Sequence, residues 1–280
     1  MTNYELNDAG QHNTFSHSGT RMARDPSVWR YMDLLSLLSL LSNETLHFTN
    51  LRDLHRFDTN EGTGGLSINV VNDPIMLGGW STDSTPEMEA RNAAELARIQ
   101  KGLSVPLAER ITDLREQVAK WDTENANVYI SCWHANELEA DFMWRIYAKH
   151  EYGFAVVSNA QDLIRCFDGY DISKIGFGFV IYPTRDQLIR EDLHSYMGID
   201  SAFMVKHPKF APENEFRVFV RPKEHAKNCD LKVNLKRLVK QIRISPLVPE
   251  WAESALLATL NPMCEKKGLP PIQPRGLKLR

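Results

Sequence analysis

The chain has 280 residues, a formal net charge of -3, 42% hydrophobic residues and 25% charged residues. This composition is typical of a globular protein with a substantial buried core. No apolar run approaches the roughly 20 residues that span a bilayer. The four cysteines are widely spaced and form no CxxC pair. We therefore expect unpaired thiols, a cytoplasmic protein and no structural metal.

Charge is distributed unevenly along the chain. From Lys206 to Arg280 there are 16 Lys and Arg against 7 Asp and Glu, a balance of +9, so the remainder carries -12. A basic C-terminal quarter can face nucleic acid or an anionic cofactor. It can equally be complementary to the acidic part of the same protein, and the sequence leaves both possibilities open.

The first predicted elements follow a polar N-terminal stretch. Residues 1–24 show no period and no signal-peptide core, so we expect a flexible arm before a single domain over residues 25–280. Repeated Leu-Leu-Ser triplets over residues 33–41 predict a helix with a wide apolar stripe. The alternating residues 45–49 predict a strand.

Residues 86–121 are charged and helical in pattern, with Pro86 in the first turn and Thr85 or Ser84 as N-cap. We interpret them as a helical insertion or lid. The remaining elements mix strands and helices without strict βα alternation, which indicates an α+β fold: a single mixed-sheet domain with flanking helices. The predicted strands are 128–133, 154–157, 175–182, 216–220, 231–233 and 241–244, and the predicted helices are 139–150, 160–165, 184–197 and 250–267.

A pair of acids at the start of a strand, Glu213 and Glu215, is the strongest chemical signal. Alternation in an extended chain would put both on one side and Asn214 on the other. Two carboxylates this close repel each other, so the pKa of one of them should rise unless a cation lies nearby. The alternative is that both acids are solvated or paired with Arg217 and Arg221.

Two further groups of residues could bind a ligand. Arg30 lies between Trp29 and Tyr31, an arrangement suited to clamping a phosphate or carboxylate, unless Arg30 pairs with an acid and the rings are core. Trp144 and Tyr147, three residues apart on a predicted helix, share a face that could stack on a planar heterocycle or simply be buried.

Several segments in this order resemble domain-of-unknown-function family 2971, a widespread prokaryotic family. The loop after the second segment departs from the usual pattern of that family around Asp58. The matching pieces are residues 29–31 with the Leu-rich helix, 46–50, 130–133, 143–148 with Gly153, and 206–210 leading into 213–217.

A shorter pattern is similar to that of ADP-ribosyltransferases: an aromatic-Arg pair, a Ser/Thr strand and Glu-x-Glu. The resemblance implies that Arg30 binds NAD, that Ser131 or Thr49 orders the site, and that Glu215, assisted by Glu213, is catalytic. The implied fold is ADP-ribosyltransferase-like.

Such an enzyme consumes NAD by breaking the bond between nicotinamide and ribose, which develops positive charge on the sugar. A carboxylate stabilises that charge, while Tyr31, Trp144 or Tyr147 would contact the cofactor. We expect an ADP-ribosyltransferase or NAD glycohydrolase that modifies a protein or nucleic acid, as a bacterial toxin or phage-defence component with partner subunits and no membrane. Arg30 and Glu215 must then converge on one cleft.

Two other functions fit the sequence. The first is nucleic-acid binding or metal-dependent cleavage through the basic C-terminal part, with Asp58, Glu213 and Glu215 as Mg²⁺ ligands. The second is a non-catalytic subunit that binds a partner protein.

Overall fold

The computed structural model describes residues 25–54, 85–101, 125–148, 152–182, 203–206, 208–224 and 229–275, with scattered residues between 103 and 116. The predicted N-terminal arm, Asp58 and the predicted helix at 184–197 lie outside the described residues. The chain forms two compact units. Unit 1 comprises Met1–Thr49, Tyr129–Phe179 and Glu213–Arg280, and unit 2 comprises Asn50–Val128 and Val180–Pro212.

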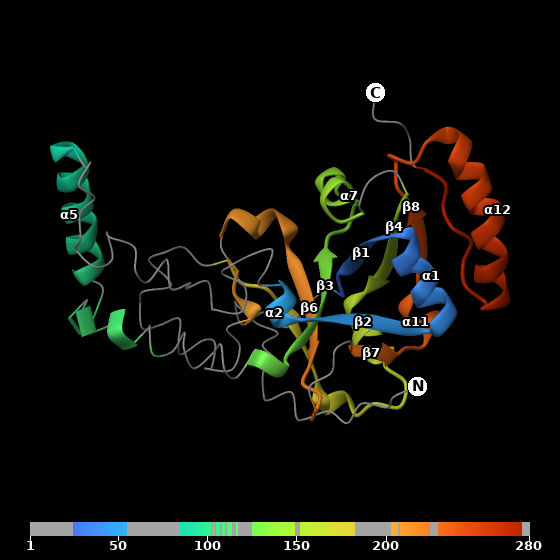
Figure 1. Cartoon of the computed structure of the whole chain (residues 1–280), viewed down its shortest axis with the longest axis horizontal. Coiled ribbons are helices and arrows are strands. Elements are labelled where there is room, and N and C mark those ends of the chain that lie inside the picture. The colour runs from blue at the N-terminus through green and yellow to red at the C-terminus, as the bar shows by residue number, and fades with distance from the viewer. Residues whose placement is uncertain are drawn as a thin grey trace. The chain divides into compact units, whose positions relative to one another are not determined.

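An eight-stranded sheet is the centre of unit 1 (Figure 1). Its path runs β5-β6-β3-β1-β4-β8, and β2 pairs with both β3 and β7. Every strand pair whose register is described is antiparallel. The strands are β1 (Ser27–Asp33), β2 (Thr45–Asn50), β3 (Tyr129–Ala135), β4 (Gly153–Asn159), β5 (Ile175–Phe179), β6 (Glu215–Val220), β7 (Cys229–Lys232) and β8 (Gln241–Ile244).

Helices flank this sheet, and together they confirm the predicted α+β class. Gly153 begins β4. The helices of unit 1 are α1 (Leu34–Asn43), α7 (Asp141–Tyr147), α8 (Ala160–Arg165), α11 (Leu235–Leu238) and α12 (Glu250–Lys266). Unit 2 contains α2 (Leu51–Leu54) and α5 (Pro86–Lys101).

The helix boundaries follow from local capping. Asp33 accepts a hydrogen bond from the backbone N–H of Ser36 at 2.8 Å, which starts α1. Glu44 adopts a left-handed conformation (φ 56°) and ends it. Thr85 caps α5 through the N–H of Met88 at 3.3 Å, so this start is confirmed.

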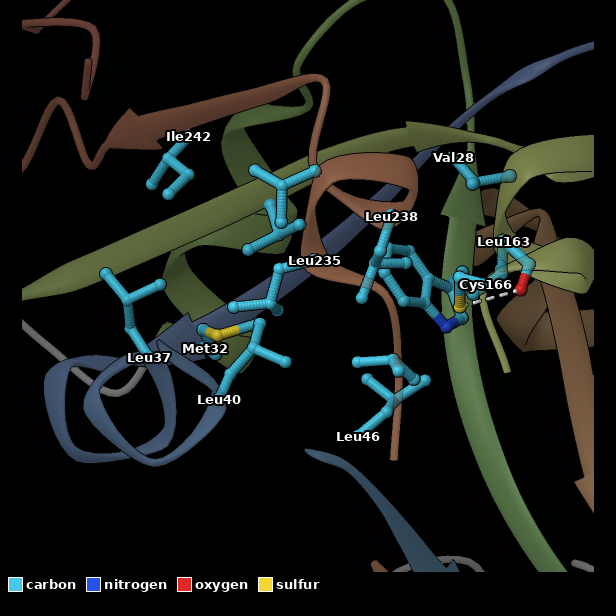
Figure 2. Close-up of a cluster of buried hydrophobic side chains, with 14 of the residues drawn as sticks. Val28, Met32, Leu37, Leu40, Leu46, Leu163, Cys166, Leu235, Leu238 and Ile242 are labelled. Atoms are coloured by element: carbon cyan, nitrogen blue, oxygen red, sulfur yellow. Dashed lines mark hydrogen bonds between the residues drawn. The ribbon is translucent and has the colours of Figure 1, made fainter. Parts of the chain in front are cut away.

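The middle strands of the sheet are buried on both faces. We call A the face that carries Val28 and B the face that carries Trp29, because neighbouring residues of a strand point to opposite sides. The A face supports the main hydrophobic core; Figure 2 shows Leu37 of α1 and Leu235 and Leu238 of α11 beside it. The B face packs against α7 through a smaller cluster: Trp29, Tyr31, Met143, Trp144, Ala148, Ala155 and Val157.

The close approach of β5 to β6 depends on Gly176, which lies opposite Phe219. A methyl group at position 176 would lie 2.0 Å from the Cζ atom of Phe219. We expect Gly176→Ala to lower the free energy of unfolding by about 1–3 kcal/mol, because the ring must move. Denaturant titration measures this. Phe219→Leu should recover part of the loss in the double variant, whereas additive costs would contradict a direct clash.

Candidate functional site

Arg30 braces the A face. Its Nη1 donates to the Ser131 hydroxyl, its Nη2 donates to the carbonyl of His47 at 2.9 Å, and its guanidinium lies 5.9 Å from the Trp133 ring centroid. Burial lowers the pKa of Arg30 to about 10, so it remains cationic at neutral pH. These bonds join β1 to β3 and β2.

Ser131 belongs to the same brace. Its hydroxyl also accepts a hydrogen bond from Trp133 Nε1 at 3.0 Å, and the residue is fully buried. Ser131 therefore holds Arg30 through contacts within the sheet. Thr49, the alternative, lies on β2 and is partly buried.

The register of three strands separates Arg30 from the glutamates. Trp29 lies opposite His134 of β3, and His134 lies opposite Glu215 of β6. Residues directly opposite one another project from the same face of a sheet. Trp29, His134 and Glu215 therefore share the B face, while Arg30 projects from the A face. The expectation that Arg30 and Glu215 converge on one cleft is wrong, because their side chains project from opposite faces of the sheet.

The two glutamates flank a turn. Glu213 ends a 3-10 helix (Pro208–Glu213), and Asn214 has a positive φ of 39° before β6 begins at Glu215. The predicted alternation through one extended segment is therefore wrong. The turn is held against the end of β3: His134 Nδ1 donates to the Glu213 carbonyl at 2.5 Å, and the Asn214 amide donates to the Ala135 carbonyl.

Tyr147 of α7 contacts the side chain of Glu213. Its hydroxyl donates to Glu213 Oε1 at 2.7 Å; Glu213 is 6% exposed and Tyr147 37%. Burial, with the charges of Glu213 and Glu215 nearby, raises the pKa of Tyr147 far above that of a free phenol. The phenol therefore stays protonated and remains a donor to the carboxylate.

Glu215 forms a buried ion pair with Arg217. Arg217 Nε lies 2.6 Å from Glu215 Oε2. The Glu215 side chain is 6% exposed and the Arg217 side chain 1% exposed. This pairing was the alternative to a catalytic acid pair, and it is confirmed for Glu215. The carboxylate compensates a charge that has no access to water.

His134 is the residue that the sequence interpretation missed. It is 3% exposed, and its Nδ1 must carry hydrogen because its partner is a carbonyl. In the neutral ring Nε2 is then an acceptor, and it has no hydrogen-bond partner among the described residues. Strand alternation could have found it, since Ile130, Cys132 and His134 share one side of β3.

Tyr31 and Trp144 pack into the B-face core. Their rings meet edge to face at 4.8 Å, Trp144 is fully buried, and the Tyr31 hydroxyl accepts from the N–H of Ala140 at 3.0 Å. Burial raises the pKa of Tyr31 to about 12. Both rings are therefore covered by protein, which leaves Tyr147 as the partly exposed aromatic residue of the predicted set.

The B face thus brings together two carboxylates, a phenol, an imidazole and a guanidinium. We call this group the carboxylate cluster, and it consists of Glu213, Glu215, Tyr147, His134 and Arg217. Among the described residues no three His, Cys, Asp or Glu side chains are arranged to hold a metal ion. The thiol of Cys132 projects from the same face and is partly exposed, and the four cysteines, all within the described residues, form no disulfide.

The chain is therefore an α+β protein whose antiparallel sheet carries a buried acid-base cluster at one face. Residues 143–218 match a family described as "Protein of unknown function (DUF2971)", which confirms the predicted family relationship over that stretch. The match includes Tyr147, Glu213, Glu215 and Arg217. Comparison with curated proteins and with solved structures finds no match. No described helix has the length and apolar content to cross a membrane.

The brace at Arg30 generates a stability prediction. Arg30→Lys keeps the charge but cannot donate to Ser131 and His47 together, so we expect the free energy of unfolding to fall by about 1–3 kcal/mol. Denaturant titration measures the change. Arg145→Lys, at an exposed ion pair with Asp141, is the matched control and should be neutral. Equal stability of the two variants would show that Arg30 is not a brace.

The buried ion pair between Glu215 and Arg217 gives a second prediction about stability. Glu215→Gln leaves the Arg217 charge uncompensated, and we expect a loss of about 3–5 kcal/mol in unfolding free energy. Replacing both partners, as Glu215→Leu with Arg217→Met, should recover most of that loss. A double variant no more stable than the single one would contradict the role of Glu215 as a counter-charge.

Proposed function

We propose that the carboxylate cluster is the active site of an NAD-consuming enzyme that cleaves the bond between nicotinamide and ribose. The observation that carries the proposal is the fixed position of Glu213. Tyr147 holds its carboxylate, and His134 holds its backbone carbonyl. The reaction class comes from the Glu-x-Glu resemblance, and the arrangement of the cluster supports it.

A fixed carboxylate suits this reaction. Positive charge develops on the ribose as the glycosidic bond breaks, and a carboxylate already oriented toward that charge stabilises it without reorganisation. Tyr147 donates to one oxygen of Glu213 and so restricts rotation of the carboxylate. Glu215 neutralises Arg217, which would otherwise oppose a cationic transition state.

The proposed reaction breaks one bond of NAD and forms one bond to the acceptor. The C1′–N1 bond breaks, and its electron pair moves onto the nicotinamide ring, which leaves as neutral nicotinamide. An oxygen or nitrogen of the acceptor forms the new bond to C1′ and loses its proton to the Glu213 carboxylate. A protein or nucleic acid as acceptor makes the chain an ADP-ribosyltransferase of the toxin or defence type, and water makes it a NAD glycohydrolase.

Arg30 takes no part in this proposal, since it lies on the A face. The proposal also gives Glu215 a different role from the one expected. Glu213 becomes the reacting carboxylate, and Glu215 becomes a positioning residue that balances Arg217.

The decisive variant is Glu213→Gln. It keeps the size and the hydrogen-bond acceptor for Tyr147 but removes the charge, so we expect NAD turnover to fall at least about 100-fold. The assay incubates the protein with labelled NAD and cell lysate, and it follows nicotinamide release and label on protein or nucleic acid. Glu250→Gln, an acid whose side chain is 79% exposed, is the control and should keep full activity.

Two results would count against the proposal. Wild-type turnover by Glu213→Gln would remove Glu213 from the mechanism. No nicotinamide release by the wild-type protein, with lysate or without it, would reject NAD as substrate and favour the partner-binding or nucleic-acid functions.

A further inference from the structure

A groove separate from the carboxylate cluster opens in unit 1. Its volume is about 630 Å³, within the roughly 300–1,000 Å³ typical of small-molecule sites. It lies where α11 meets the C-terminal end of α12. Its lining consists of Glu44, Asp168, Val233, Asn234, Leu235, Lys236, Met263, Lys266 and Lys267.

The basic C-terminal quarter is only partly neutralised by the acidic part of the chain. Lys240 pairs with Asp162 at 2.7 Å, and Lys267 pairs with Glu44 at 2.6 Å. These contacts support self-complementarity as one source of the charge asymmetry. Two lysines that line the groove are not paired in this way. Among the described residues, neither Lys236 nor Lys266 has an ion-pair partner.

Lys236 is held close to the turn that follows α12. Gly268 has a positive φ of 67°, and a methyl group there would lie 2.9 Å from Lys236 Cε and 3.1 Å from its Nζ. The absence of a side chain at position 268 therefore lets the Lys236 ammonium approach the end of α12. That end also carries Lys266 and Lys267, so three lysines line one groove.

The three lysines lie near one end of α12. Lys266 and Lys267 lie at the C-terminal end of α12, where cations interact favourably with the helix dipole. Lys236 belongs to the four-residue helix α11, and its side chain reaches the turn that follows the same end of α12. An anion in the groove would relieve the repulsion among these three lysines.

We propose that the groove binds a small phosphorylated ligand with hydroxyl groups, of the size of a nucleoside monophosphate. The phosphate lies between Lys236 and Lys266. Asp168, an exposed carboxylate on the rim, accepts hydrogen bonds from the sugar hydroxyls. The apolar side of the groove, which includes Met263, contacts the base.

Calorimetry with the full chain tests this, with adenosine monophosphate, inorganic phosphate and adenosine as separate probes. We expect the nucleotide to bind at least 10-fold more tightly than either fragment. The double variant Lys236→Ala with Lys266→Ala should weaken nucleotide binding at least 10-fold. The double variant Lys101→Ala with Lys174→Ala removes the same charge at positions that do not line the groove, and it should bind like the wild type.

Two single variants show which part of the protein holds the nucleotide. Asp168→Asn should weaken nucleotide binding but not phosphate binding. Glu213→Gln should leave nucleotide binding unchanged, which distinguishes the groove from the carboxylate cluster. Phosphate binding as tight as nucleotide binding, no binding at millimolar probe, or binding indifferent to Lys236 and Lys266 would each overturn the proposal.

Discussion

The alternation of side chains across a sheet whose middle strands are buried on both sides governs what this protein can do. In β1, Trp29 and Tyr31 face α7, whereas Arg30 faces the main core. In β6 the same constraint places Glu215 and Arg217 together and excludes them from the environment of Arg30. A shift of one residue in either strand would exchange these environments. The composition of the candidate site is therefore a consequence of strand pairing.

Local elements were predictable because they depend on short-range patterns. The Leu-rich stripe and its capping by Asp33 define α1, and α8 was expected over the residues that form it. The sequence could not show that Arg30 and Glu215 lie on opposite faces of the sheet. It shows which residues of one strand share a face, but it does not show the register between strands. The turn at Asn214 was also missed, since a positive φ in a non-glycine residue interrupts alternation without an obvious signal.

Charge gave a similar mixture of success and failure. The excess of Lys and Arg near the C-terminus was visible in the composition, and so was the option that it pairs with the acidic part of the chain. Which lysines pair depends on how α11 and α12 pack, and this needs tertiary structure. The ion pair between Lys267 and Glu44 shows one outcome. Lys236, which has no ion-pair partner within the described part of the chain, shows the other.

Helix α7 has no side-chain cap at its start, and a phenol secures each end. Tyr31 accepts the N–H of Ala140 at the beginning, and Tyr147 at the end donates to Glu213. The second bond joins the helix to the reacting carboxylate itself. Any molecule that takes the place of Tyr147 on Glu213 would release one end of a seven-residue helix. Amide hydrogen exchange in α7 would then report whether Glu213 is occupied, whatever the molecule's chemical identity.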